Sequence, residues 1–378
     1  MTIFLLVYLS LYCLTHYYLL RKIKTAFTPG RTAHLVIIPF MAIMVAGPVL
    51  VRLAEKGGYE TGARIVSYAG YTWMGLLFLF VTLSGAVDII RFILRKTNPS
   101  GGRTPMWVWV SSRRLLTIEM LIVAAAYGYG LFEATDIRLE HVEIASPKIP
   151  AHPGRIRIVQ ISDVHLGLII RGQRLSKIIA CIESANPDIL VSTGDLVDGQ
   201  LNHLATEAEL LAALTPPLGK IAVTGNHEFY AGLQNALDFT EQAGFTILRH
   251  QGITAGGINL VGVDDRALTS WSREPLRSER DLLLALPRKN FTILLKHRPD
   301  IDPESLGHFD LQLSGHTHKG QIFPFNLLTW LAYPKQAGHL TPLESGFLYL
   351  SRGTGTWGPP IRLLAPPEIT IIDLLHGQ

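Results

Sequence analysis

The sequence predicts an α/β domain that follows a bundle of about four membrane-spanning helices. Three observations lead to this prediction. Long apolar stretches fill the first third of the 378-residue chain. Beyond residue 155, strand-like runs alternate with amphipathic helical segments, and strands dominate toward the end. Polar and ionisable residues gather directly after the strand-like runs, which is where an open α/β sheet places its ligands.

The composition divides the chain into two parts. Hydrophobic residues make up 48% of it and charged residues only 17%, whereas about a quarter of a soluble globular protein is charged. The first 134 residues contain 13 Lys or Arg and 5 Asp or Glu, and the remainder contains 21 and 25. The basic character therefore belongs to the apolar part. The later part is mildly acidic, which argues against a nucleic-acid partner because such a partner needs a basic face.

Four apolar stretches approach or exceed the roughly 18–20 helical residues that cross the hydrocarbon core of a bilayer. They are Thr2–Leu20, Leu35–Val51, Val66–Ile90 and Leu115–Phe132. The second is the shortest and contains Pro39 and Pro48. We therefore expect a transmembrane domain over residues 1–134, a linker over 135–154 and a separate domain over 155–378.

The basic residues of the short loops predict how these spans are oriented. The loops after the first and third spans carry at least four Lys or Arg each, whereas Glu55 and Glu60 offset the basic residues of the middle loop. Basic loops face the cytoplasm. The domain after the fourth span is then expected outside the cytoplasm, in an integral protein of the cell membrane. Asp88 and Glu119 lie near span ends, which leaves a direct function and an interfacial position equally open.

Five groups of polar residues follow predicted buried strands. In chain order they are Asp163 and His165; Asp195 and Asp198; Asn226, His227 and Glu228; His297; and His316 and His318. Each group alone is compatible with an ordinary polar loop or helix cap. Together, their carboxylate, carboxamide and imidazole side chains suit one or two divalent metals, and imidazole favours Mn, Fe, Zn or Ni over Mg and Ca. The set contains no cysteine, which argues against a structural zinc site.

This ordered series resembles the signature of the calcineurin-like metallophosphoesterases, which is D-x-H, G-D-x-x-D, G-N-H-[DE], a lone H and G-H-x-H. All five blocks stand between residues 155 and 320, from Asp163-Val-His165 to Gly315-His316-Thr317-His318. The stretch YLSRGTGTWGPPIRLLAPPEITIIDL, which begins at Tyr349, resembles the bacterial branch with N-terminal membrane spans. The resemblance implies a four-layer α-β-β-α sandwich that binds two divalent metal ions of unknown identity.

The resemblance also implies which residues bind metal. One ion would be held by Asp163, His165 and His318, the other by Asn226, His297 and His316, and Asp195 would bridge the two. No organic cofactor is expected.

Four further residues match or adjoin the signature. His227 corresponds to the family's catalytic histidine, which contacts the substrate and protonates the leaving oxygen. Asp198 is expected to orient a ligand, and Glu228 is a further supporting or substrate-contacting candidate. Lys319 stands where membrane-linked relatives often have glycine, and it is either a cation near the bound phosphate or a solvated lysine.

The function implied by the resemblance is that of a metal-dependent phosphoric ester hydrolase. We expect metal-activated hydroxide to attack a phosphoester or pyrophosphate bond of a small-molecule or lipid-linked substrate, at the membrane and outside the cytoplasm. Two metals about 3.5–4 Å apart can clamp the attacking and leaving oxygens, and the signature offers no Ser or Cys nucleophile paired with a base.

Two alternatives remain open from the sequence. The site also suits a phosphodiesterase of soluble nucleotides, and the same fold could serve as a non-catalytic membrane binding or sensing module. The apolar stretch 321–334 is compatible with either a hydrophobic flap beside the site or a part of the core.

Overall fold

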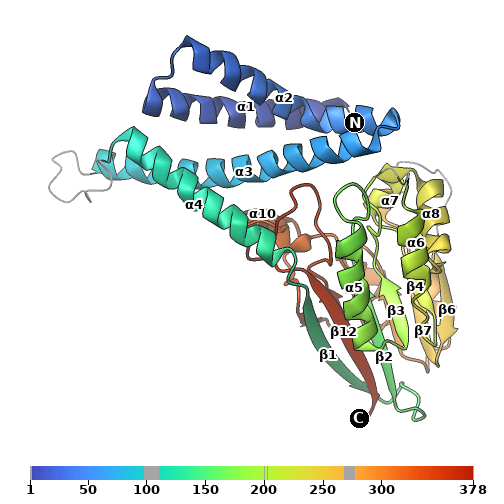
Figure 1. Cartoon of the computed structure of the whole chain (residues 1–378). Coiled ribbons are helices and arrows are strands. Elements are labelled where there is room, and N and C mark those ends of the chain that lie inside the picture. Colours follow the sequence, from blue (N-terminus) through green and yellow to red (C-terminus); the bar gives the residue numbers. More distant parts are fainter. Residues whose placement is uncertain (1, 98–109, 200, 202, 268–276, 378) are drawn as a thin grey trace. The chain divides into compact units, whose positions relative to one another are not determined.

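The computed structural model describes residues 2–97, 110–199, 201, 203–267 and 277–377. The chain divides into two compact units. The helical unit comprises Met1–Phe132 and Gly358–Ile361, and the α/β unit comprises Glu133–Trp357 and Arg362–Gln378. Figure 1 shows the long helices of the first unit and the sheets of the second.

The helical unit contains four long helices, α1 (Thr2–Phe27), α2 (Arg31–Lys56), α3 (Glu60–Thr97) and α4 (Ser112–Glu133). Among the described residues, the segments long and apolar enough to cross a membrane are Arg31–Glu55, Glu60–Thr97 and Ser112–Glu133. These contain the second, third and fourth predicted spans, and α2 continues through both of its prolines. The first predicted span lies in α1 and stays a prediction, as does the orientation.

A lysine of α1 lies beside both carboxylates of this unit that the sequence singled out. Lys22 Nζ is 2.8 Å from Asp88 Oδ1 on α3 and 3.7 Å from Glu119 Oε2 on α4. Ser84 donates a further hydrogen bond of 2.9 Å to Glu119, whose side chain is only 2% exposed. Because a carboxylate in apolar surroundings is costly unless it is paired, this arrangement supports a structural role for Asp88 and Glu119.

The first sheet of the α/β unit has six strands in the order β1-β12-β2-β3-β4-β5. Their bounds are β1 (Arg138–Ser146), β2 (Arg155–Ile161), β3 (Ile189–Ser192), β4 (Lys220–Ala222), β5 (Thr246–Ile247) and β12 (Glu368–His376). The pairs are parallel except that β12 runs antiparallel to β2. Strand β1 lies within the range predicted as a linker. Its alternation of exposed and less exposed side chains suits an edge strand, so the sheet begins before residue 155.

The second sheet also has six strands, in the order β10-β11-β9-β8-β7-β6. Their bounds are β6 (Gln251–Ala255), β7 (Ile258–Gly262), β8 (Thr292–Leu295), β9 (Leu311–Ser314), β10 (Leu340–Pro342) and β11 (Phe347–Leu350). Apolar residues of the two sheets share one core, in which Ile158 and Val191 of the first meet Leu260 and Ile293 of the second. The sheets therefore pack face to face.

Helices cover the outer faces of the two sheets. Helix α5 (Gly172–Ala185) buries Leu175, Ile178 and Ile182 and lies against β12 of the first sheet. Helix α9 (Glu279–Leu284) buries two leucines against the second sheet. The shorter elements are α6 (Ala205–Ala212), α7 (Asn226–Ala231), α8 (Leu233–Gln242), η3 (Pro303–Ser305), η4 (His318–Gly320) and α10 (Phe325–Ala332). These layers confirm the predicted α-β-β-α sandwich.

Candidate metal centre

The predicted metal-binding residues follow strands of both sheets. Asp163 and His165 come after β2, Asp195 after β3, Asn226 after β4, His297 after β8, and His316 and His318 after β9. Five of them have backbones in the left-handed region, with φ of 52° at Asp163, 54° at His165, 52° at Asp195, 76° at His316 and 48° at His318. Residues other than glycine rarely adopt this conformation, and such strain concentrates at functional sites.

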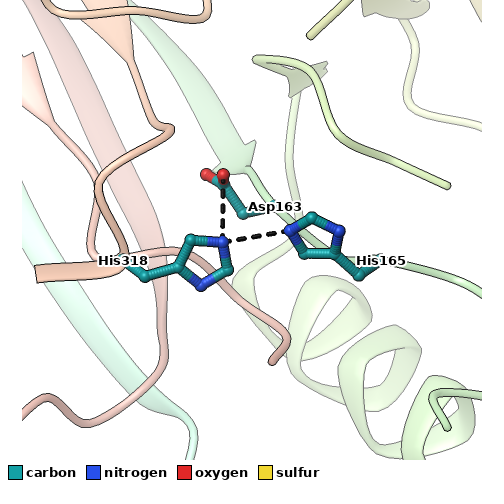
Figure 2. A group of neighbouring side chains, drawn as sticks. All are labelled: Asp163, His165 and His318. Carbon is teal, nitrogen blue, oxygen red and sulfur yellow. Dashed lines mark hydrogen bonds and ion pairs between the residues drawn. The ribbon is translucent and has the colours of Figure 1, made fainter. Parts of the chain in front are cut away.

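Asp163, His165 and His318 form the first cluster of candidate metal-binding side chains (Figure 2). His318 Nε2 lies 3.3 Å from Asp163 Oδ1 and 3.0 Å from His165 Nε2. Asp163 is held in place by the backbone N–H of His316 at 3.0 Å and by the Ser162 hydroxyl at 2.5 Å. All three side chains are buried.

The second cluster consists of Asp195, His297 and His316. His297 Nε2 lies 3.2 Å from Asp195 Oδ2 and 3.2 Å from His316 Nδ1. The same Asp195 oxygen lies 3.9 Å from His165 Nε2 of the first cluster. One carboxylate therefore lies between both clusters, at the position where a bridging ligand would stand.

The donor atoms of each cluster suit a divalent metal ion. Within each cluster the donor atoms all lie within 4.8 Å of one another. Two pairs of imidazole nitrogens point toward each other at 3.0 and 3.2 Å, which requires a proton or a cation between their lone pairs. Among the described residues the side-chain oxygen of Asn226 is buried and has no hydrogen-bond partner. An orphaned buried oxygen of this kind fits a metal ligand.

Contacts with neighbouring oxygens select which ring nitrogen His297 and His165 present to the clusters, through a hydrogen bond at His297 and through the nearby Asp198 carboxylate at His165. His297 Nδ1 donates to the carbonyl of Thr193 at 2.9 Å, which leaves Nε2 for a ligand. His165 Nδ1 lies 3.4 Å from Asp198 Oδ1, and its Nε2 points into the first cluster. Metal-binding histidines in proteins are oriented by such partners.

Burial and nearby charges shift the pKa values of the histidines in the two clusters in opposite directions. At His297 burial lowers the pKa, but the Asp195 carboxylate outweighs it and raises the pKa to about 10. Burial, helped by His297 and Arg298, lowers the pKa of His316 to about 3. Burial also lowers the pKa of His318 to about 4. His316 and His318 are therefore neutral at physiological pH, whereas His297 would release its second proton on binding a metal ion, because metal-binding imidazoles are neutral.

His227 lies at the edge of the clusters and carries a proton. Its backbone N–H donates to Asp195 Oδ1 at 2.8 Å, and its Nδ1 donates to the carbonyl of Asp198 at 2.9 Å. Burial lowers its pKa, but the carboxylates of Asp195 and Asp198 outweigh burial and raise the pKa to about 10. The ring packs edge-on against His165 on one side and the exposed Trp357 on the other. A charged imidazole held in this way can donate a proton to a leaving group.

Asp198 and Glu228 contact the residues of the two clusters and the loops that carry them. Asp198 Oδ1 lies 3.1 Å from His227 Nδ1 and 3.4 Å from His165 Nδ1, so one carboxylate orients two imidazoles. Glu228 accepts hydrogen bonds from the backbone N–H groups of Gly225 at 2.6 Å, Asp195 at 3.1 Å and Leu196 at 2.8 Å. These bonds join the loop after β3 to the start of α7.

Lys319 follows His318 in η4 with a φ of 51°. Burial lowers the pKa of its ammonium, and the positive charge of Arg352 lowers it further. The next strongest influences come from Glu368 and Arg138, which belong to the β1–β12 side of the first sheet. The charges that act most on Lys319 are thus outside the two metal-binding clusters.

At two glycines of the signature, the backbone lies so close to neighbouring side chains that no Cβ atom would fit. A Cβ at Gly225 would collide with the carboxylate of Asp195, and one at Gly315 would collide with Ser162 and Asp163. In both cases the backbone of one loop lies directly against a metal-binding carboxylate of another. The glycine of each motif is therefore part of the site's geometry.

Sequence reasoning missed a buried arginine that holds the loop carrying His318. Arg362 is fully buried and donates to the carbonyls of His318, Arg352, Gly353, Gly355 and Ala365. Its Nη2 also lies 3.2 Å from His318 Nδ1, and burial lowers its pKa to about 9. Arg362 belongs to the C-terminal stretch from Tyr349 onward, which resembles the membrane-spanning branch of the family and is the sequence feature that points to it.

A second missed group orients His316. Arg298 Nη1 lies 3.1 Å from His316 Nε2, and Arg298 Nε donates to Asp265 Oδ2 at 2.7 Å. Asp265 comes shortly after β7, so the rule that found the other groups also applies to it. Arg298 directly follows His297 in the chain.

Comparison with known proteins identifies the class of this chain. Residues 156–320 match the calcineurin-like phosphoesterase family. A metallophosphoesterase of Aquifex aeolicus is 38% identical over 258 residues, which cover 68% of this chain and 98% of the relative. The chain therefore belongs to the calcineurin-like phosphoesterase family and is a phosphoester hydrolase. Its donor clusters indicate that it uses divalent metal.

Other similar proteins differ in how much of the chain they match. A transmembrane protein with a metallophosphoesterase domain from Danio rerio is 28% identical over 363 residues, covering 92% of this chain and 81% of the relative. Its name and the apolar helices indicate a membrane protein here. The solved 5'-nucleotidase precursor from Thermus thermophilus matches with a TM-score of 0.37 and 16% identity. That match covers 59% of this chain and 54% of the other.

Proposed function

We propose that this chain is a membrane-anchored phosphoesterase that uses two divalent metal ions against a lipid-linked or cell-envelope phosphoester outside the cytoplasm. Residues 1–134 anchor it, and the α/β unit carries the catalysis. The observation that carries the two-metal proposal is the position of Asp195, which lies within 4 Å of an imidazole nitrogen in each of two separate clusters.

The protein's own residues would share the work as follows. Asp163, His165 and His318 would hold one ion and Asn226, His297 and His316 the other, with Asp195 within reach of both clusters. Bound divalent ions lower the pKa of water and polarise phosphoryl oxygens, which is the chemistry that this reaction needs. His227, with its Nδ1 bonded to the Asp198 carbonyl, keeps its other nitrogen for delivering a proton to the leaving oxygen.

The completeness of the donor set supports catalysis over a role in binding alone. Every residue of the family's metal-binding signature is present, and the supporting contacts from Asp198, Glu228 and Arg298 are formed as well. A protein that only used the fold as a scaffold would have no physical need for this set.

The experiment that tests the proposed function is an activity screen on the purified full-length chain. With Mn²⁺, Fe²⁺, Zn²⁺ or Ni²⁺ added, it would be offered soluble aryl phosphomonoesters and phosphodiesters, nucleotides, pyrophosphates and lipid phosphates. We expect metal-dependent hydrolysis, abolished by a chelator, with the highest kcat/KM on a lipid phosphate. Failure on every ester with every metal would overturn the proposal, and preference for a nucleotide would redirect it.

The predicted orientation is tested separately. A reporter enzyme that folds only outside the cytoplasm, fused after the last residue, should be active in cells. An inactive fusion together with an active cytoplasmic reporter at the same point would place the α/β unit in the cytoplasm.

A further inference from the structure

Helix α10 is apolar, and most of its large side chains are exposed. No charged residue occurs from Gln321 to Pro334, and α10 buries none of its side chains. We define the apolar patch as five exposed side chains of this segment: Phe323, Leu327, Leu328, Trp330 and Leu331. Leu331 is 70% exposed and Trp330 60%. The stretch that was compatible with either a flap or the core is therefore not core.

The apolar patch adjoins the metal-binding residues at both ends of the segment. At its start, a Cβ on Gly320 of η4 would collide with the backbone of Asn326, so α10 packs directly on the turn that carries His318. At its end, the ring of Tyr333 lies 5.5 Å from that of His316. Tyr333 also accepts a hydrogen bond of 3.3 Å from Arg298.

A second exposed aromatic residue extends the apolar surface toward His227. The side-chain amide of Gln321 bonds to the backbone of Trp357 in both directions, at 2.8 and 2.9 Å. Trp357 is 56% exposed, and its ring lies 5.8 Å from that of His227. An exposed aromatic side chain that is bonded to the start of this segment thus lies beside the residue proposed to protonate the leaving group.

A lipid bilayer is the partner that this composition fits. Exposed helices rich in Trp, Phe and Leu lie in the interface of a membrane with their apolar side among the acyl chains, and apolar patches of this kind mark interaction sites. The patch carries no charge to repel lipid. The basic residues Lys335 and Arg266, the second of which bonds to the Tyr333 hydroxyl, suit anionic headgroups.

The connection between the two units brings a bilayer within reach. Helix α4 is long and apolar enough to cross a membrane and ends at Glu133, and β1 begins at Arg138. The residues between them span at most about 14 Å when fully extended, at roughly 3.3–3.6 Å each. The α/β unit therefore starts close to the end of a candidate span.

We propose that the apolar patch inserts into the membrane interface, so that the metal centre works on phosphoesters whose apolar part stays in the bilayer. The proposal has a structural half, that α10 contacts lipid, and a catalytic half, that this contact brings membrane-held phosphoesters to the metal centre. The catalytic half rests on the proposed function. The structural half does not depend on any enzymatic activity.

Fluorescence quenching in nanodiscs tests the structural half. The full-length chain with Cys13→Ser and Cys181→Ser would carry Leu328→Cys or, as a matched control, Leu210→Cys on α6, each labelled with an environment-sensitive dye. We expect lipids brominated on their acyl chains to quench the label at position 328 at least about fivefold more than the label at 210. Equal quenching would overturn the proposal. A blue-shifted label at 328 without quenching would do so too, because protein rather than lipid would cover the patch.

Kinetics test the catalytic half. The triple variant Leu327→Ser, Leu328→Ser, Leu331→Ser would be compared with Leu210→Ser in nanodiscs. For a phospholipid substrate, we expect kcat/KM to fall at least about tenfold, since three leucines lose their contact with lipid. For a soluble aryl phosphodiester we expect no change.

The remaining outcomes separate the two proposals. An equal fall on both substrates, or no fall on either, would overturn the role of α10. If the unaltered chain hydrolyses no phosphoester at all, the proposed function fails, and the quenching experiment still decides whether α10 lies in lipid.

Discussion

Asp195 is the residue on which the geometry of the site depends most. Its Oδ2 faces His297 at 3.2 Å and His165 at 3.9 Å, and its Oδ1 accepts the backbone N–H of His227 at 2.8 Å. Burial raises its pKa, but the surrounding imidazoles, His297 first, bring the pKa well below its ordinary value. It therefore stays ionised and available for metal at any physiological pH.

At the residue scale, Asp195→Asn and His227→Ala should both reduce activity. Asp195→Asn should do so by weakening metal binding, and His227→Ala by removing the proton donor. Removing a general acid lowers the rate by roughly 10²–10⁴-fold, and we expect a loss of at least about 100-fold for both variants. Asp195→Asn should also lower the bound metal per chain, measured by elemental analysis, whereas His227→Ala should keep it. His227→Ala should regain rate on esters whose leaving group needs no proton. Near-normal turnover in either variant would show that the site is misassigned.

At the scale of elements, loops from different strands are tied together by a few buried polar side chains. Glu228 at the start of α7 accepts three backbone N–H groups that belong to two loops. Arg362 does the converse, because it donates to carbonyls on both sides of the turn that carries His318. Strained backbones at the strand ends are held in place by these contacts rather than by local propensity.

Glu228→Gln should destabilise the protein. The amide NH₂ would face N–H donors where a carboxylate oxygen now accepts, and a hydrogen bond to a charged group contributes roughly 1.5–3 kcal/mol. We expect a loss of that size in the free energy of unfolding, measured by denaturant titration of the full-length chain, with a lower metal content. Glu209→Gln on the exposed side of α6 is the control and should change neither quantity.

In the helical unit, Lys22→Met should leave Asp88 and Glu119 without their cation. Breaking a buried ion pair by removing one partner costs roughly 3–5 kcal/mol, and partial exposure of Asp88 places the expected loss at or below the lower figure. The thermal midpoint in detergent should fall for Lys22→Met and recover in Lys22→Arg. The exposed Lys24→Met serves as the control, and an equal fall there would contradict the assignment.

At the scale of the whole molecule, the sheet of the α/β unit is joined by an ion pair between strands far apart in sequence. Arg157 on β2 donates to both oxygens of Asp373 on β12, at 2.8 and 2.7 Å. Hydrogen bonding to Arg157 lowers the pKa of Asp373. A carboxyl whose folded pKa lies below its unfolded value of about 3.9 stabilises the fold above that pH and loses this contribution as the pH falls through the folded pKa.

The corresponding prediction concerns acid stability. Asp373→Asn should lower the thermal midpoint of the full-length chain at pH 7, and the gap to the unaltered protein should close below about pH 4, where the carboxyl becomes protonated in the unfolded chain. Melting curves between about pH 3 and pH 8 measure this directly. A gap that stays constant across the range would mean that the pair contributes nothing through its charge.

The candidate site could be predicted from the sequence because ligand types recur in a fixed order at strand ends, and the structure brings most of these residues together. Asp163, His165, Asp195, His297, His316 and His318 could be named from their spacing and their place after buried strands. Arg362 could not, because its partners are backbone carbonyls that only folding brings near, whereas Asp265 follows β7 and satisfies the same rule. The range 135–154 was assigned to a linker because β1 is an edge strand whose polar alternation is weak evidence for pairing.

By itself, the sequence determined the order of apolar helices and α/β layers and the family, and it predicted a metal-binding set, since each depends on residue type and local periodicity. Only the tertiary structure decided which residues meet. It placed Asp195 between two clusters, aimed the imidazole nitrogens and left the side chains of α10 unburied beside His318. These features depend on contacts between segments more than a hundred residues apart, such as that of His165 with His318, which no local pattern encodes.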